Sequence, residues 1–228
     1  MNTSRLKVLS MSVAAVVLLA SCASTAPPKE SGFLPDYSKL QRADAPGGGT
    51  RLLYVNPAFV PANYDAIYLE PLRYYPTPQP SDKVSMQTLE TLRVYADQSL
   101  RSKVGQRIRI VNAPGPRVAR WQIAVTAVGA DTEALKAYQY IPIGLAITGA
   151  MALAEGGRPQ MASIAIENHV TDSTTNVLLF ASVRGGTGEQ IKSASQGAPT
   201  VQPDDLKPLI DQWTDAAAGE VAKYVKSK

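Results

Sequence analysis

Two neighbouring side chains in this sequence could do acid–base chemistry. His169 is the only histidine among 228 residues, and Glu167 lies two positions before it in the stretch ASIAIENHVT. Hydrolysis by a serine or cysteine nucleophile ordinarily needs such a base within hydrogen-bonding distance. If this stretch is a strand, both side chains point to one face and could form a pair. A solvated face of a hairpin explains the same pattern, and we favour that interpretation over a hydrolase.

Other patterns typical of catalysis or ligand binding do not occur in the sequence. One histidine and one cysteine are too few for a zinc site, and there is no Asp-rich loop of the calcium-binding kind. The stretch GGTGEQ (185–190) lacks the third glycine of a phosphate-binding loop and is predicted to begin a Gly- and Ser-rich loop. Carboxylates distant in the chain could still meet, as in a glycosidase. We expect no cofactor, no metal and no enzymatic activity, with a hydrolase as the open alternative.

The single cysteine, Cys22, has a more specific explanation. It follows a basic start and an apolar run, VLSMSVAAVVLLA, that is too short for a membrane span of about 20 residues. The residues LASC match the bacterial lipobox, in which the cysteine is acylated and becomes the first residue. We predict that residues 1–21 are a signal peptide, that cleavage falls between Ser21 and Cys22, and that Cys22 carries a lipid anchor. An ordinary secretory signal with an incidental cysteine is the alternative.

Acylation of Cys22 would hold the mature chain at a membrane and leave it without a thiol. Several acyl chains on one residue make such an anchor effectively permanent. Because an Asp directly after the cysteine favours retention in the inner membrane, Ala23 favours the outer membrane, with the domain facing the periplasm. The signal peptide carries two basic residues and no acid, so the formal net charge falls from +4 to +2. This small charge argues against a nucleic-acid partner.

The mature chain divides into a tether and one domain. Residues 22–50 are rich in Pro and Gly without periodicity, which indicates a flexible tether, although FLPDYSKL (33–40) could dock on the domain. Residues 51–228 are predicted to form a single α+β domain. Its helices are expected to begin after an N-cap at Ser81 and after one at Asp204 or Asp205. Its strands are expected at 51–57, 64–75, 106–112, 118–130, 161–171 and 176–185.

The expected order of elements is β-β-α-β-β-(α)-β-β-α. The turn residues NAPGPR predict a hairpin between 106–112 and 118–130, and DSTT predicts another between 161–171 and 176–185. A doubly wound parallel sheet would need strands and helices that alternate singly. The order therefore favours an antiparallel or mixed sheet with helices packed mainly on one face.

The bracketed element is the stretch YIPIGLAITGAMALAEGG, residues 140–157. It has no charge from Ile141 to Ala154, yet it is too short to cross a bilayer. Gly144, Thr148 and Ala152 recur at every fourth position, a spacing of small residues that allows close helix packing. We favour a helix buried behind the sheet. A surface for oligomerisation or membrane contact is the alternative.

Five stretches occur in a characteristic order: FLPDYSKL, RLLYVNP, YDAIYLEP, IPIGLAITGA and ASIAIE. Together they resemble the bacterial lipoproteins catalogued as domain of unknown function 3313, over most of residues 33–226. The resemblance implies an envelope lipoprotein with one α+β domain, and it supplies no catalytic residues.

We arrive at three hypotheses for function. The leading one is a non-enzymatic interaction or assembly lipoprotein that binds a protein partner in the cell envelope. The second is a self-assembling or pore- or secretion-associated subunit that oligomerises through residues 140–157. The third is a hydrolase that uses Glu167 and His169.

Overall fold

The structure is a computed structural model, and it describes residues 30–81, 83–131, 161–191 and 200–226. Several predicted sites lie outside these ranges: the cleavage and lipidation residues Ser21 and Cys22, and the segment 140–157 with Ile141, Gly144, Thr148 and Ala152. The expectations for these residues therefore stay predictions.

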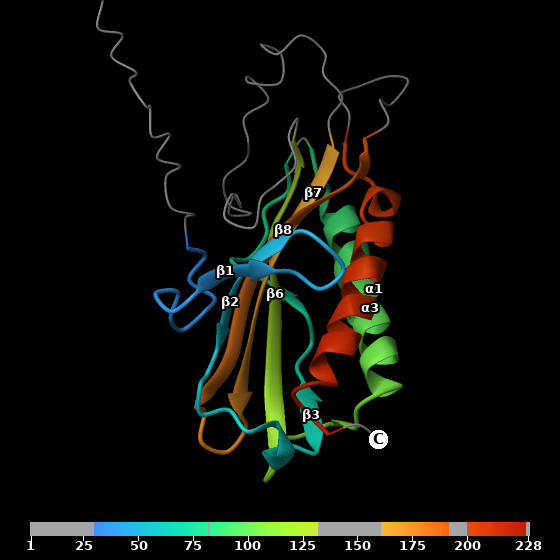
Figure 1. Ribbon diagram of the computed structural model, residues 1–228. Coiled ribbons are helices and arrows are strands. Elements are labelled where there is room, and N and C mark those ends of the chain that lie inside the picture. Colours follow the sequence, from blue (N-terminus) through green and yellow to red (C-terminus); the bar gives the residue numbers. More distant parts are fainter. Residues whose placement is uncertain (1–29, 82, 132–160, 192–199, 227–228) are drawn as a thin grey trace, which may run out of the picture.

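One mixed sheet contains eight strands from the described parts of the chain (Figure 1). Their order is β1-β2-β8-β7-β6-β3-β5, and β4 also pairs with β6. The strands span Gln41–Asp44 (β1), Thr50–Val55 (β2), Ala66–Leu69 (β3), Arg73–Tyr74 (β4), Ile110–Val111 (β5), Val118–Asp131 (β6), Met161–Asp172 (β7) and Leu178–Gln190 (β8). The predicted α+β class with a mixed sheet is confirmed.

The long strands β6, β7 and β8 form the antiparallel centre of the sheet. The predicted hairpin of β7 and β8 is confirmed. The loop expected to begin at residue 185 is wrong, because β8 continues to Gln190. Gly186 and Gly188 are needed in this extension, since a Cβ atom would collide with the Trp213 ring at the first position and with the backbone of Asp205 at the second.

The predicted hairpin between 106–112 and 118–130 is wrong. β5 pairs in parallel with β3, and β3 pairs in parallel with β6, so β3 lies between them. Ala66, Ile67 and Leu69 of β3 are all buried. A strand that is apolar on both faces belongs in the interior of a sheet. The turn in NAPGPR therefore reverses the chain but does not determine the pairing partner.

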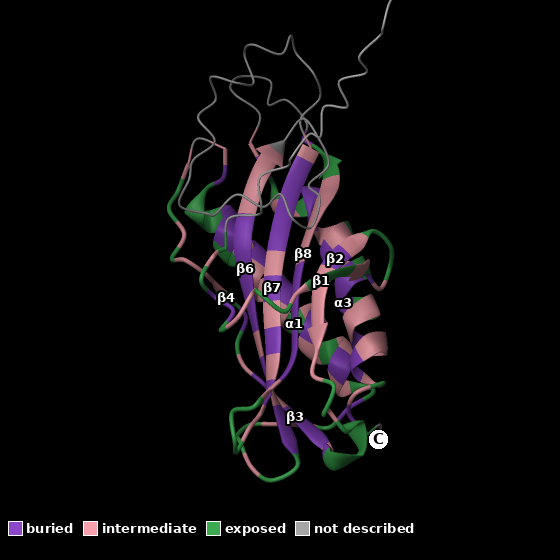
Figure 2. Ribbon diagram, turned by 60° about the vertical axis from the view of Figure 1, so that its left-hand side comes forward, coloured by how far each residue is buried: buried purple, intermediate pink, exposed green. Residues whose placement is uncertain are grey.

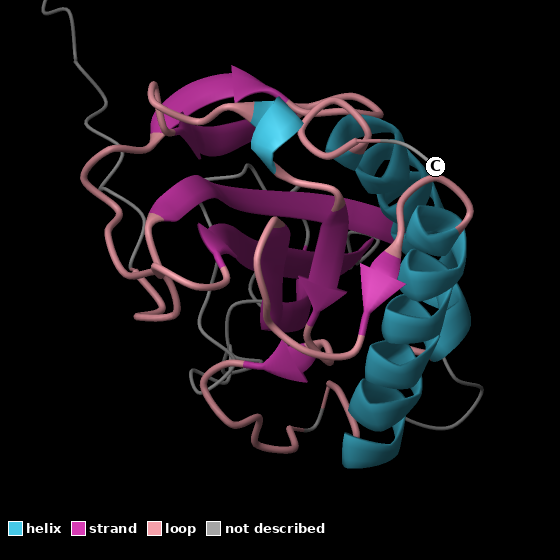
Figure 3. Cartoon of the chain, turned by 90° about the horizontal axis from the view of Figure 1, so that it is seen from below, coloured by secondary structure: helices cyan, strands magenta, loops and turns pink. Residues whose placement is uncertain are grey.

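Two helices, α1 (Met86–Gly105) and α3 (Lys207–Val221), lie side by side on one face of the sheet (Figures 1 and 3). Neither is long and apolar enough to cross a membrane, and the same holds for every helix among the described residues. The N-cap of α1 is Ser85, whose hydroxyl accepts from the Thr88 N–H at 3.0 Å. The predicted cap, Ser81, instead accepts from the Val84 N–H at 3.1 Å and forms the turn before the helix.

The second predicted helix start is displaced by a short 3-10 turn, η2 (Pro203–Asp205). The carboxylate of Asp205 accepts from the Gln202 N–H at 2.7 Å and caps this turn. The regular helix α3 begins two residues later.

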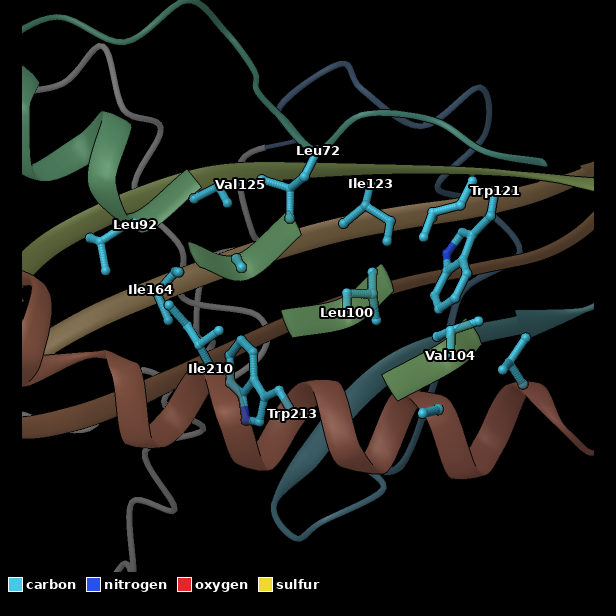
Figure 4. Packing of buried hydrophobic residues seen from close by; sticks show 14 of the residues in the cluster. Leu72, Leu92, Leu100, Val104, Trp121, Ile123, Val125, Ile164, Ile210 and Trp213 are labelled. Atoms are coloured by element: carbon cyan, nitrogen blue, oxygen red, sulfur yellow. The ribbon is translucent and has the colours of Figure 1, made fainter. Parts of the chain in front are cut away.

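The main hydrophobic core lies between the sheet and the two helices (Figure 4). Figure 2 shows how burial alternates along the strands and follows the inner faces of the helices. The spacing of the apolar residues in the sequence identified the inward faces of α1, α3 and β6. Core residues on these faces include Leu92, Leu100 and Val104 from α1, Trp121 and Ile123 from β6, and Ile210 and Trp213 from α3.

A smaller apolar cluster covers the opposite face of the sheet. Residues 30–40, which we call the strap, bury Phe33 and Leu34 against Ala165 of β7 and its neighbours. The docking expected for FLPDYSKL is confirmed. β1 pairs antiparallel with β2, so residues 30–50 pack as part of the domain and differ from the tether expected there.

Candidate functional site

Glu167 and His169 point to the sheet face that the strap covers. Along β7 they alternate with Ile166, Asn168 and Val170, which face α3. Glu167 is 0% exposed and His169 is 8% exposed. The expected solvated hairpin face is therefore wrong, because the strap buries both side chains.

Tyr37 fastens the strap to the sheet. Its hydroxyl donates to Oε2 of Glu167 at 2.5 Å and accepts from the backbone N–H groups of Gly32 and Leu34, each at 3.1 Å. Burial and the hydrogen bond to Glu167 raise the pKa of Tyr37 to about 12. The hydroxyl thus keeps its proton for this bond at neutral pH, and the pair holds the strap in place.

His169 is held in a single tautomer. The Gln122 amide donates its N–H to Glu70 at 3.0 Å, so its oxygen, 2.8 Å from Nε2 of His169, accepts the histidine proton. Nδ1 is buried and has no hydrogen-bond partner among the described residues. Burial, aided by the positive charge of Arg73, lowers the pKa of His169 to about 4.

The surroundings of His169 are those of a packed side chain. Its ring centroid lies 5.1 Å from that of Phe33 in the strap, and the hydrogen bond described for it goes to an amide, not to a hydroxyl nucleophile. Within the described ranges, no three His, Cys, Asp or Glu side chains lie close enough together to bind a metal ion. The geometry therefore indicates that Glu167 and His169 stabilise the packing of the strap on the sheet.

An apolar cleft lies on the other face of the sheet, between β7 and α3. It consists of an outer cavity of about 90 Å³ and an inner cavity of about 80 Å³, which we together call the cleft. Figure 4 shows Trp121 from β6 and Trp213 from α3 reaching into this layer. The two cavities share a wall formed by Trp121, Ile166, Asn168, Trp213 and Ala217.

The exposed fractions of side chains on β7 show that the helices do not completely cover this face of the sheet. Ile166, Asn168 and Val170 are only half-buried, although β7 lies between two long strands. The polar floor is internally paired: Asn168 accepts from Trp121 Nε1 at 3.2 Å and donates to Ser182 Oγ at 3.2 Å. The cleft is therefore an open space with mostly apolar walls and a paired polar floor.

Three charged side chains line the outer cavity. Arg51, only 7% exposed, donates to both carboxylate oxygens of Glu220, at 2.7 and 2.5 Å, while its Nε–H has no described partner. Arg184 lies over the Trp213 ring, 4.4 Å from its centroid, and donates to backbone oxygens of the β1–β2 turn. Burial lowers the pKa of Arg184 to about 10, so the guanidinium stays charged at neutral pH.

The sequence analysis did not predict the cleft. Its residues come from β2, β3, β6, β7, β8, α1 and α3 and from the loops beside them, and no local motif connects them. Arg51 and Glu220, for example, are 169 positions apart. The one local sign is Ala217, a small residue in the apolar stripe of the last helix, where a larger side chain would fill the space.

Comparison with known proteins identifies the family. A family model described as a protein of unknown function (DUF3313) matches residues 29–217. The chain belongs to this family. The uncharacterized lipoprotein YdcL of Escherichia coli (strain K12) is 32% identical over 211 residues, which cover 91% of this chain and 93% of the relative. The resemblance found in the sequence is thereby confirmed, and the chain is a DUF3313 lipoprotein.

Two solved structures show weak similarity. A PelC dodecamer from Paraburkholderia phytofirmans is 12% identical with a TM-score of 0.34, covering 74% of this chain and 98% of that one. A homolog of neuraminyllactose-binding hemagglutinin from Helicobacter pylori is 12% identical with a TM-score of 0.31, covering 75% and 88%. Neither similarity enters the functional argument.

Proposed function

We propose that this DUF3313 lipoprotein works by binding and not by catalysis. In this proposal it is anchored to the outer membrane, faces the periplasm and holds another component of the cell envelope. The observation that carries the proposal is the open apolar cleft between β7 and α3. Covering such a surface is favourable, and apolar clefts with a few placed polar groups are the usual form of binding sites.

The polar side chains support the same proposal. A catalytic acid or base must come within hydrogen-bonding distance of its substrate. Glu167 and His169 are instead buried beneath the strap and hydrogen-bonded to Tyr37 and Gln122. The most buried ion pair at the cleft, Arg51–Glu220, is likewise bonded within the fold. The part of the cleft that is free to contact a ligand is therefore its apolar wall.

The binding function can be tested in cells by photo-crosslinking from the cleft. Benzoylphenylalanine replaces Tyr224, which lines the outer cavity, and in a control it replaces Val177, which is 50% exposed and does not line either cavity. We expect an adduct of defined mass, lipid or protein, at residue 224 alone. The same adducts at both positions, or none at residue 224, would refute the proposal.

The outer-membrane location is tested separately through Ala23. Membrane fractions separated by density should contain the wild type in the outer membrane, and Ala23→Asp should move the protein to the inner membrane. A wild type found in the inner-membrane fraction would contradict the proposed location and leave the binding proposal intact.

A further inference from the structure

We propose that the cleft binds a single acyl chain with an acidic head group, either a carboxylate or a phosphate. This inference rests on the proposed binding function and names its ligand class. The arguments are the shape of the cleft, the state of its polar groups and the charge in its outer cavity.

The shape of the cleft favours a narrow linear ligand. Val170, Asn168 and Ile166 line the outer cavity, and Asn168, Ile166 and Ile164 line the inner one. These residues succeed one another on one face of β7, so the cavities lie in line along the strand. Arg184 of β8 lies opposite Ile166, at the level where the two cavities meet. The two cavities, at about 90 and 80 Å³, together only slightly exceed the ~150 Å³ apolar cavity that holds benzene, so they admit a narrow apolar segment of a chain and exclude a bulky ring system.

The polar groups favour an acyl chain over a peptide. A buried peptide strand brings N–H and C=O groups that must find hydrogen-bond partners. The floor offers few, because Asn168 and Ser182 are the polar side chains there and already bond to each other, with Asn168 also bonded to Trp121. Methylene groups need no such partners and gain free energy from the apolar walls.

The β8 and β2 side of the outer cavity favours an acidic head group. Arg51 and Arg184 contribute two positive charges against the one negative charge of Glu220. The Arg51 Nε–H, buried and without a described partner, lacks an acceptor that a carboxylate or phosphate oxygen would supply. The head group thus lies beside Arg51 and Arg184, and the chain runs inward towards Leu100 and Ile123 of the inner cavity.

The two tryptophans provide a direct readout. Trp121 and Trp213 are the only tryptophans of the chain, and both line the cleft. Dodecanoate brominated near its methyl end quenches indole fluorescence on contact. The mature chain, residues 22–228 with Cys22→Ser so that no detergent is needed, is titrated below the micelle concentration of the probe. We expect saturable quenching, and a weaker response to the brominated alcohol of the same length.

A substitution that fills the cleft tests whether the ligand binds there. Ala217 lines both cavities, so Ala217→Phe should abolish the quenching by bromododecanoate. Ala62→Phe is the matched control, because Ala62 is exposed and lines neither cavity. Circular dichroism verifies folding, and Ala217→Leu replaces the larger substitution if the Phe variant does not fold. Saturable quenching that survives the filled cleft would overturn the proposal, as would no quenching of the wild type.

A second substitution tests the head group. Arg184→Met should weaken bromododecanoate binding roughly tenfold, the lower range for a hydrogen bond to a charged group, and leave the alcohol unaffected. Bromododecyl phosphate, run in parallel, decides between the two acidic heads by its affinity. If the wild type bound the brominated acid and the brominated alcohol with equal affinity, the proposal of an acidic head group would be overturned.

The two proposals fail separately. Absence of quenching, together with a protein adduct from residue 224 in cells, would refute the acyl-chain ligand and retain the binding function. Quenching that meets every expectation, without any adduct in cells, would show a lipid-binding cleft and remove the support for the cellular role.

Discussion

Replacing His169 tests how the strap is held, because the imidazole is buried in its neutral form. Its pKa is lowered from 6.5 to about 4, first by burial and then by Arg73. The folded pKa lies below the unfolded one, so the unfolded chain takes up this proton first as the pH falls. The stability that His169 contributes is therefore complete above pH 6.5 and is lost as the pH falls towards 4. A difference of this size corresponds to at most about 3 kcal/mol.

The perturbation is His169→Gln, which keeps a side-chain N–H for the Gln122 oxygen and does not titrate. Urea denaturation of both proteins at a series of pH values from 7 to 4 gives the free energy of unfolding. Other charged groups around the site, Glu70, Arg120 and the adjacent Glu167, are common to both proteins, so their titration cancels in the difference. We expect the wild type to lose up to about 3 kcal/mol relative to the variant as the pH falls. Parallel curves over this range would refute the buried neutral histidine.

Three further predictions concern other parts of the chain. Tyr37→Phe removes the donor to Glu167 and should lower the free energy of unfolding by about 2 kcal/mol, measured by urea denaturation at pH 7. Gly188→Ala should destabilise by about 1–3 kcal/mol or prevent folding, because the added methyl group meets backbone, whereas Gly115→Ala, in open space, serves as the control with little effect. Cys22→Ala should abolish incorporation of labelled palmitate and release the protein from the membrane fraction, and an unchanged label would contradict the lipobox assignment.

Local periodicity in the sequence predicted the parts of the fold that local interactions determine. Met86, Leu89, Leu92, Ala96, Leu100 and Val104 recur at helical spacing, and all of them except Met86, which is exposed in the first turn, are buried in α1. The β7–β8 hairpin followed from a short polar turn between two strand-like arms. In both cases the residues that decide the structure lie within a few positions of one another.

The predictions that were wrong concern positions in the sheet that are decided by contacts between segments far apart in the sequence. β3 takes the position beside β6 that the NAPGPR turn appeared to give to 106–112, because a strand buried on both faces gains more there. The solvated face expected for Glu167 and His169 is covered by a strap more than a hundred positions earlier in the chain. Neither outcome can be read from the local sequence. The same holds for the cleft, whose lining comes from seven helices and strands.

The strap changes how far the domain can lie from its predicted anchor. The sequence favoured a tether over residues 22–50, whose full extension would reach roughly 100 Å at about 3.6 Å per residue. Because Tyr37 and Phe33 fix the strap to the sheet, only the residues between Cys22 and Glu30 remain, and they reach at most about 30 Å. The anchor would thus keep the strap face close to the lipid head groups. Since the cleft opens on the opposite face of the same strand, β7, the proposed acyl chain would have only the width of one small domain to travel from the membrane.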